Sequence, residues 1–523
     1  MLRCGKRRPG RRIYRTSTMM RLDRRPMATR AAGILQGTGR QGTDVPVALP
    51  LIVFALLLYW ANPIGYVGGG GDDWQYLTAA ECWIASGPCL PHDHWWARWP
   101  LIAPMAASIA ALGESRAAVA LVPLLWSVAA LLLFARIVER LAGRAAALAA
   151  GVVLLLTPVF TIQFARPNVD HVELALLLAA LLGWVETVRT GKRGWALLLG
   201  FGLGLAFLAR ETSAVFVAAA GIAFLRAPMA EKRLLIWAAP AFALPVAAEM
   251  LTYFASTGDP FYRLRLAFAH TRIPSAELAL WVDTSRSPLF NPDFIAGWRP
   301  ANGIEAHWAV KPLFNLATHA HIGMTLIGAV ALSIVAPRDS AGTNRRTLLG
   351  LAAIAGGAAL IFIYALGIDP KPRMFLPLAA VSAAAAGIAA VALWRSGSKL
   401  IPLVTAGFLL PPAFLSYLAV PANAPAERSA AEWLAAAPGS ITTDETTRRY
   451  LALVPVARAL PVDTALPLRL AIATEPCPAA VRQATTHDGE WGVLAAMRAR
   501  SIGLSPDTGL WLCLHRQDTP TSR

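Results

Sequence analysis

Long apolar runs separated by short polar segments dominate the pattern of the chain. A membrane-spanning helix needs ~20 mostly apolar residues, and eleven segments approach that length. They are residues 45–62, 116–136, 143–158, 170–188, 194–209, 211–226, 233–255, 313–336, 347–367, 374–394 and 400–420. A shorter run at 99–113 is interrupted by proline, so we expect it to lie along the membrane surface. The pattern predicts an all-α polytopic membrane protein with about 11 transmembrane helices.

Composition supports this prediction, and the position of the charged residues shows where the positive net charge lies. Of 523 residues, 56% are hydrophobic and 15% charged, and the mean hydropathy is +0.50. The formal charge of +17 is concentrated in residues 1–44, where twelve Lys and Arg face two Asp, a net charge of +10. This segment has no apolar periodicity, so we predict a disordered basic tail that binds acidic lipid headgroups and not nucleic acid. The start codon stays open among Met1, Met19, Met20 and Met27, and we expect a retained anchor, not a cleaved signal peptide.

The charged loops predict a topology. Every second loop is basic, which the positive-inside rule assigns to the cytoplasm. These loops contain Arg136, Arg140 and Arg144; Arg189, Lys192 and Arg193; Arg226, Lys232 and Arg233; Arg338, Arg345 and Arg346; and Arg395 and Lys399. We therefore predict a transmembrane domain at 45–420 with outer loops at 63–115 and 256–312.

Cysteine usage agrees with that assignment. Cys82 and Cys89 lie in the first outer loop, Cys477 and Cys513 in the C-terminal region, and Cys4 alone lies inside. Two local pairs on an oxidising face predict two disulfides, with four unpaired thiols as the alternative.

The C-terminal residues 421–523 have a mixed pattern. A helix is predicted over 427–437, a strand over 440–443 and a helix capped by Asp444. We expect a small α/β domain outside the membrane.

Carboxylates follow the first apolar segment directly. Gly68 to Gly71 precede Asp72 and Asp73, with Trp74 and Tyr76 close behind. Glycines permit sharp bends, aromatic residues favour the membrane interface, and carboxylates near a membrane suggest function. The alternative is a solvated turn after a helix.

Cations from distant segments are predicted to lie at the same outer face as these carboxylates. They are Arg98, Arg166, Arg210, Lys371 and Arg373, and Asp170 accompanies them. Lys and Arg bind phosphate oxygens through charge-assisted hydrogen bonds, so this pattern suggests a site for a lipid with a phosphate headgroup.

Structural alternatives exist for three of these cations. Arg166 would pair with Asp170 at a helix start, Arg210 would pair with Glu211 at a kinked junction, and Arg98 would only anchor an aromatic interface segment. A metal site of His92, His94 and His171 with the aspartates is a further alternative. We favour ordinary loop histidines there, and no metal or cofactor is indicated.

Five short motifs together resemble a known family. Asp72-Asp73-x-x-Tyr76 resembles the Asp-Asp/Glu-x-x-Tyr signature of GT-C membrane glycosyltransferases of the family 39 and 83 type. That group includes the protein O-mannosyltransferases and the lipid A aminoarabinose transferases. Four further motifs are similar to its later segments in the same order: Arg98-Trp-Pro100-Leu, Thr157-Pro158 with Arg166 and Asp170, Gly204 to Arg210, and Arg373-Met-Phe-Leu-Pro377. The resemblance covers residues 45–380.

The resemblance implies GT-C architecture and inverting transfer of a sugar from a polyprenyl-phosphate donor to a hydroxyl acceptor. Asp72 would be the general base, and Asp73 and Asp170 would orient the acceptor or sugar, with Tyr76 and Trp74 contacting them. The donor phosphate would be bound by Arg98, Arg166, Arg210, Lys371 and Arg373. Arg stands where the family has Lys at Arg98 and Arg210, and Glu211 follows the second. The Trp-Trp-Asp-Tyr-Gly signature of oligosaccharyltransferases is missing, which argues against transfer of a whole glycan to Asn.

Two other classes of function remain. A secondary transporter or flippase for an anionic lipid-linked substrate predicts charges near the bilayer midplane and inverted repeats, and no repeat is visible. A membrane scaffold leaves the outer charges unexplained. We expect a monomer in a bacterial inner membrane with its active site facing the periplasm.

Overall fold

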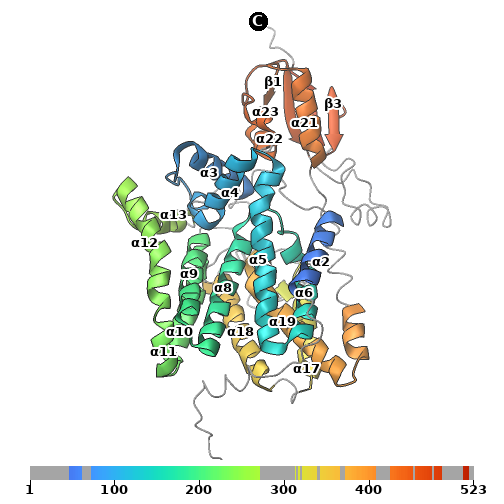
Figure 1. Cartoon of the computed structure of the whole chain (residues 1–523). Helices are drawn as coiled ribbons and strands as arrows, with labels where there is room; N and C mark the ends of the chain where they lie inside the picture. The colour runs from blue at the N-terminus through green and yellow to red at the C-terminus, as the bar shows by residue number, and fades with distance from the viewer. Residues whose placement is uncertain are drawn as a thin grey trace, which may run out of the picture.

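A bundle of helices forms the body of the molecule, and a small sheet lies beyond one end of it (Figure 1). The computed structural model describes residues 46–61, 72–270, 313, 316–317, 321–337, 342–365, 372–407, 424–451, 454–473, 476–485 and 511–517. The predicted basic tail, Gly68 to Gly71, Lys371 and most of the 256–312 loop lie outside these residues.

The bundle is built from the following helices and turns. They are α2 (Ala48–Ala61), α3 (Asp72–Ser86), η1 (Trp95–Ala97), α4 (Trp99–Leu112), α5 (Arg116–Ala142), α6 (Arg144–Leu155), α7 (Pro158–Thr161), α8 (Val169–Thr190), α9 (Arg193–Ala209), η2 (Glu211–Ser213), α10 (Ala214–Arg226), α11 (Met229–Leu235), α12 (Ala238–Thr257), α13 (Tyr262–His270), α17 (Gly323–Val335), α18 (Gly342–Leu360), η3 (Ile361–Ala365), η4 (Pro372–Phe375) and α19 (Leu376–Arg395).

Four of the described helical segments are long and apolar enough to cross a membrane. They are Arg116–Ala142, Val169–Thr190, Met229–Thr257 and Arg373–Arg395, and six shorter apolar helices accompany them. The protein is therefore a helical membrane protein. The count of eleven spans stays a prediction, because the 400–420 segment is described only to residue 407.

Small residues allow the central helices to approach closely. A Cβ atom on Gly387 of α19 would lie 2.4 Å from the backbone nitrogen of Ala150 in α6. A Cβ on Gly200 of α9 would lie 1.9 Å from the carbonyl oxygen of Ala238 in α12. Such contacts leave no room for larger residues. The glycines of the 350–360 segment differ, since no described atom lies within 4 Å of a Cβ at Gly350, Gly356 or Gly357.

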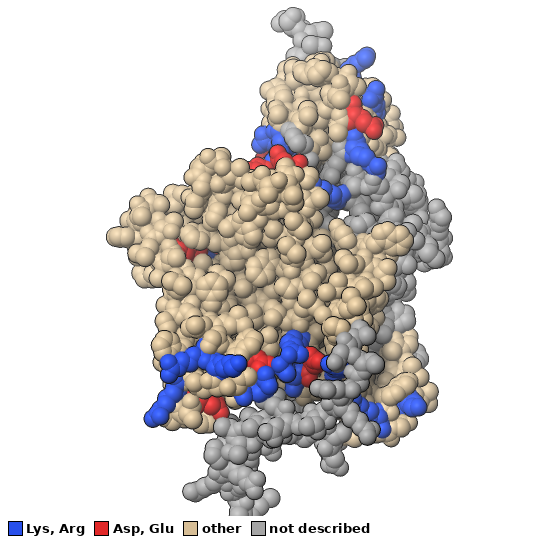
Figure 2. All heavy atoms as spheres, viewed as in Figure 1, with Lys and Arg blue, Asp and Glu red and all other residues tan. Residues whose placement is uncertain are grey.

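Charged residues mark the end of the bundle that lies farthest from the sheet. Figure 2 shows a band of Lys and Arg around this end and a mostly uncharged surface above it. Arg140 in the last turn of α5 pairs with Glu186 near the end of α8, with 2.7 Å between Nε and Oε1. Arg189 pairs with the same glutamate. The predicted basic loops at these helix ends and helix α3 therefore lie at opposite ends of the bundle.

The run at 99–113, expected along the membrane surface, forms α4 beside α3 at the sheet end of the bundle (Figure 1). Its apolar face is buried against α3 and α5 through Leu101, Ile102 and Met105, each with 0% of its surface exposed. Arg98 precedes the helix, and Pro100 occupies its first turn, where the missing N–H costs nothing. This packing holds α3 in place from one side.

The C-terminal region, residues 424–517 as far as they are described, forms a mixed sheet with helices. Its elements are α21 (Ala424–Ala436), β1 (Ile441–Thr443), α22 (Glu445–Tyr450), α23 (Pro455–Arg458), β2 (Leu468–Ala473), β3 (Arg482–Thr485) and β4 (Trp511–Arg516). The strand order is β1-β2-β4-β3, with β1 parallel to β2 and the other pairs antiparallel. Asp444 caps α22 by accepting a hydrogen bond from the Thr447 backbone nitrogen at 2.8 Å, as predicted.

Candidate active site

Helix α3 begins with the two carboxylates that the sequence singles out. Asp72 and Asp73 occupy its first turn, where the partial positive charge of a helix N-terminus favours acidic side chains. Asp73 is buried, and one of its carboxylate oxygens has no hydrogen-bond partner among the described residues. Burial raises the pKa of Asp73, while the nearby Arg166 opposes that rise. Asp73 is thus a buried acid with an unused acceptor atom.

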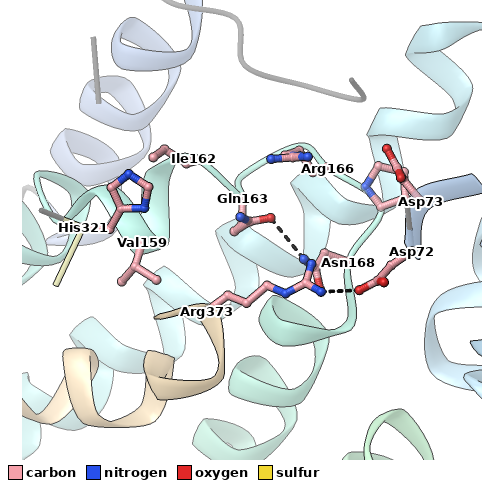
Figure 3. A pocket seen from close by; sticks show the side chains of 10 residues that line it. Asp72, Asp73, Val159, Ile162, Gln163, Arg166, Asn168, His321 and Arg373 are labelled. Atoms are coloured by element: carbon pink, nitrogen blue, oxygen red, sulfur yellow. Dashed lines mark hydrogen bonds and ion pairs between the residues drawn. The ribbon is translucent and has the colours of Figure 1, made fainter. Parts of the chain in front are cut away.

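A cavity of about 330 Å³ opens in front of this helix start. Its lining combines charged groups with a smaller apolar side. The lining residues are Asp72, Asp73, Val159, Ile162, Gln163, Arg166, Pro167, Asn168, His321 and Arg373. Figure 3 shows side chains from α3, from α7 and the loop that follows it, from the turn before α19 and, for His321, from the segment that leads into α17. The cavity lies at the low end of the ~300–1,000 Å³ typical of small-molecule sites.

Arg373 links the two predicted acidic motifs. Its guanidinium donates a hydrogen bond to the Asp72 carboxylate across 301 positions of sequence (Figure 3). Its Nε lies 3.6 Å from the second oxygen of Asp170. This contact places the positive charge of Arg373 directly against the Asp72 carboxylate. The turn at 372–375 thereby connects the first and second acidic motifs in a single cluster.

Arg210 does not reach the cavity. Its Nη1 pairs with Asp170 and lies 3.4 Å from Glu173, whose other oxygen accepts a hydrogen bond of 2.6 Å from Ser213. Two buried carboxylates thus already pair with Arg210, and its role in binding phosphate stays a prediction. Asp170 also does not line the cavity; it orients Arg210 and Arg373.

Arg98 is likewise occupied by protein groups. Its Nη1 donates to the carbonyl oxygen of Ala209 at 2.7 Å and to Glu211 at 2.8 Å. Arg263 of α13 also binds Glu211, at 3.0 Å, and it binds Glu249 of α12 at 3.1 Å. These residues form a largely buried four-residue network, which we call the Arg263 network: Arg98, Glu211, Arg263 and Glu249. The phosphate contact of Arg98 stays a prediction. The suggested Arg210–Glu211 pair is wrong, since these neighbours turn to different partners.

Arg166 is the cation that remains available in the cavity. It lines the cavity, and no ion pair joins it to a described residue. Burial lowers its pKa, and the negative charge of Asp73 opposes this. The alternative pairing with Asp170 is not formed, because Asp170 binds Arg210 and Arg373 instead. The loop that carries Arg166 is fixed by a hydrogen bond of 2.7 Å from Ser127 to the carbonyl oxygen of Phe164.

Tyr76 and Trp74 do not face the cavity. Tyr76 is 1% exposed and packs in the apolar core between α3, α4 and α5, and burial raises its pKa. Trp74 packs against the same core. Neither side chain lines the cavity, and their contacts with sugar or acceptor stay a prediction. Lys371 lies outside the described residues.

Several residues of the site were missed by sequence reasoning. Gln163, Asn168 and His321 line the cavity, and Asn168 donates to Gln163 at 3.1 Å (Figure 3). An acid inside an apolar segment is a recognisable signal, so Glu249 within 233–255 could have been found. His321 offered no such signal, since it reaches the cavity only through the fold.

The histidine alternative has no support in the described part of the chain. His171 is buried beside the rings of Phe160 and Phe164, at 4.7 and 6.4 Å between centroids. One group of three metal-ligating residue types occurs among the described residues, namely Cys477, Cys513 and His515. Both sulfurs of that group are bonded to each other.

The structure pairs the cysteines as the sequence suggests. Cys82 and Cys89 form one disulfide, and Cys477 and Cys513 form the other, with Cα atoms 6.1 and 6.2 Å apart. The first closes the turn at the end of α3, and the second joins β4 to the segment before β3.

A family model matches part of the chain. Residues 98–255 match the family described as dolichyl-phosphate-mannose-protein mannosyltransferase. The matched segment is less than a third of the chain and contains Arg98, Arg166, Asp170 and Arg210. It confirms the resemblance to GT-C membrane glycosyltransferases that the motifs indicate. No curated protein matches the sequence.

Similar solved structures have low identity. An oligosaccharyltransferase of Archaeoglobus fulgidus in complex with Zn and sulfate is 15% identical, with a TM-score of 0.48, over 79% of this chain and 58% of the other. ArnT from Cupriavidus metallidurans bound to undecaprenyl phosphate is 11% identical, with a TM-score of 0.49, over 91% of this chain and 99% of the other. The chain thus spans less than two thirds of the length of the first of these proteins.

Proposed function

We propose that this membrane protein, which resembles GT-C glycosyltransferases, is an inverting glycosyltransferase. It transfers a sugar from a polyprenyl-phosphate donor to a hydroxyl or phosphate acceptor on an envelope glycolipid, glycan or protein. One observation carries the proposal: the carboxylates of Asp72 and Asp73 share a cavity with Arg166 and Arg373. Such a cavity combines a base for the acceptor with cations for a phosphate leaving group.

Asp72 is the proposed general base. Its carboxylate lies at the cavity and bonds Arg373. In the proposed reaction this carboxylate accepts the proton of an acceptor hydroxyl. A positioned base contributes typically 10²–10⁴-fold in rate. Asp73, buried beside it, orients the acceptor or sugar.

Arg166 and Arg373 are the proposed phosphate ligands. As the sugar leaves, negative charge develops on the lipid phosphate, and fixed cations stabilise it most in a site sheltered from water. Arg166 carries this role most directly, because no carboxylate within ion-pair distance compensates it among the described residues. The proposal keeps Lys371 as a third ligand and requires no metal cofactor.

The proposed location is a bacterial inner membrane with the cavity facing the periplasm. The support is that the basic helix ends and helix α3, which starts at the cavity, lie at opposite ends of the bundle (Figures 1 and 2), together with two disulfides on the side of α3. Disulfides persist in the periplasm. The protein would act as a monomer.

The test uses purified protein in lipid nanodiscs with a panel of polyprenyl-phosphate sugars, measuring release of polyprenyl phosphate. Asp72→Asn should lower turnover by about 10²–10⁴-fold, and Asp73→Asn by less. Asp259→Asn is the control, since this acid pairs with the exposed Arg265 and should leave turnover unchanged. Full turnover in both Asp72→Asn and Asp73→Asn would contradict the proposal, and a larger loss in Asp73→Asn would transfer the role of base to Asp73.

The acceptor requires a second experiment. Mass spectrometry of envelope glycolipids and glycoproteins from a deletion strain should show loss of one sugar from one class of molecule. An unchanged sugar inventory combined with altered distribution of a lipid-linked sugar between the leaflets would favour the flippase alternative.

A further inference from the structure

Arg458 connects the C-terminal region to the helix that carries the candidate base. It is the last residue of α23, and its guanidinium forms ion pairs with Glu81 of α3 and with Glu114, which lies between α4 and α5. The side chains of Arg458, Glu81 and Glu114 are 16%, 32% and 30% exposed. One shielded cation is therefore shared by two carboxylates from different segments.

The contact lies on the helix that begins with Asp72. Glu81 follows Asp72 by nine residues, a distance of ~13 Å along a helix. Next to Glu81, the Cys82–Cys89 disulfide closes the turn that ends α3. Helix α3 is thus held at its start by the contact between Asp72 and Arg373, and near its end by Arg458 and the disulfide.

Glu81 and Glu114 depend on Arg458 as their shared counter-ion. Burial raises the pKa of Glu81, and Arg458 is the group that opposes this. Without Arg458, Glu81 and Glu114 would lie near each other without their shared counter-ion, and like charges repel. This repulsion would act directly on α3, which carries Glu81, and on the loop of residues 113–115 that joins α4 to α5.

We propose that Arg458 is a positioning residue that sets the placement of Asp72 and Asp73 through Glu81 and Glu114. The role of the C-terminal region in this proposal is to hold α3 against the cavity. The expected effect on turnover rests on the proposed function, whereas the expected effect on the position of α3 does not. Misplacing a catalytic group by 1 Å costs up to ~10²-fold in rate.

The experiment compares full-length Arg458→Met with wild type in nanodiscs. We expect kcat to fall by about 10- to 100-fold, with the KM for the lipid donor nearly unchanged, because Arg166 and Arg373 do not lie on α3. Amide hydrogen exchange of peptides that cover residues 72–86 should increase. Arg458→Lys should be intermediate, since an ammonium group lacks the fork that reaches two carboxylates.

Arg469→Met is the matched control. Arg469 lies in the C-terminal region, is 41% exposed and pairs with Asp463 of that region. Its substitution should therefore change neither kcat nor the hydrogen exchange of residues 72–86. If Arg458→Met does not fold, the double variant Glu81→Gln with Glu114→Gln removes the same contacts and should give the same result. Unchanged exchange over residues 72–86 would overturn the inference, as would unchanged kcat. Absence of sugar transfer by wild type would instead remove the proposed function, and the exchange measurement would still decide whether Arg458 holds α3.

Discussion

At the scale of single residues, the partner of each charged side chain decides its role. Arg98, Arg210 and Arg166 are the same residue type in similar sequence surroundings. Arg98 and Arg210 are compensated by buried carboxylates, whereas Arg166 lines the cavity without an ion pair to a described residue. Among the described residues, the cations that line the cavity are therefore Arg166 and Arg373.

The raised pKa of Asp73 leads to a prediction about pH. An acid with a higher pKa in the folded state stabilises the fold below its unfolded pKa, and this stabilisation is lost as pH rises through the folded pKa. As pH rises from below 3.8, the model-peptide value, through the raised pKa of Asp73, wild type should lose apparent melting temperature relative to Asp73→Asn. Arg166→Met should move this loss to higher pH, because Arg166 opposes the rise. Parallel melting curves at all pH values would show that Asp73 has the same pKa in both states.

At the scale of elements, buried ion pairs join segments that the sequence separates. The Arg263 network ties the start of α4 to η2, α12 and α13. Arg263 and Glu249 are 3% and 4% exposed in their side chains. Neither is near a motif, and each is meaningful only because the helices meet. Such networks fix the relative placement of elements more than they add stability.

The Arg263 network predicts a large and specific loss of stability. Arg263→Met would leave Glu249 without its cation, while Glu211 keeps Arg98, and breaking a buried pair costs about 3–5 kcal/mol. The measurement is the unfolding midpoint in mixed detergent micelles. Arg265→Met is the control, since Arg265 is 64% exposed and such surface changes stay within about 0.5 kcal/mol.

A second variant separates charge burial from packing in this network. Adding Glu249→Gln to Arg263→Met should recover part of the lost stability, because the uncompensated charge of Glu249 is then removed. No recovery in the double variant would mean that Arg263 acts mainly through packing or its 2.9 Å hydrogen bond to the carbonyl oxygen of Phe207.

At the scale of the whole molecule, the two ends of the bundle differ in chemistry. One end has the band of basic residues, and the other has the cavity, the aromatic segment around α4 and the C-terminal region (Figures 1 and 2). By the positive-inside rule, the basic end is predicted to face the cytoplasm and the opposite end to face the outside.

Cysteine labelling tests that direction. In a Cys4→Ser background, we expect Glu432→Cys in α21 to react in intact cells with a thiol reagent that does not cross the membrane. Lys192→Cys, at the junction of α8 and α9, should react only after the cells are permeabilised. Both positions are exposed. The reverse pattern would place the cavity in the cytoplasm and contradict the proposed location.

Features that depend on neighbours in the chain follow from the sequence. Apolar runs predict helices such as α5, α8 and α19, because the length and composition of each run are enough to show that it can be buried or inserted in a membrane. The cap at Asp444 and the nearby cysteines Cys82 and Cys89 are local in the same sense. Which cations are compensated follows only from the fold, because Glu249, Arg263 and Glu173 reach their partners only after distant helices pack. The fold also decided that His321 lines the cavity and that Arg458 reaches α3, since ion pairs across hundreds of residues depend on distances that no local pattern records.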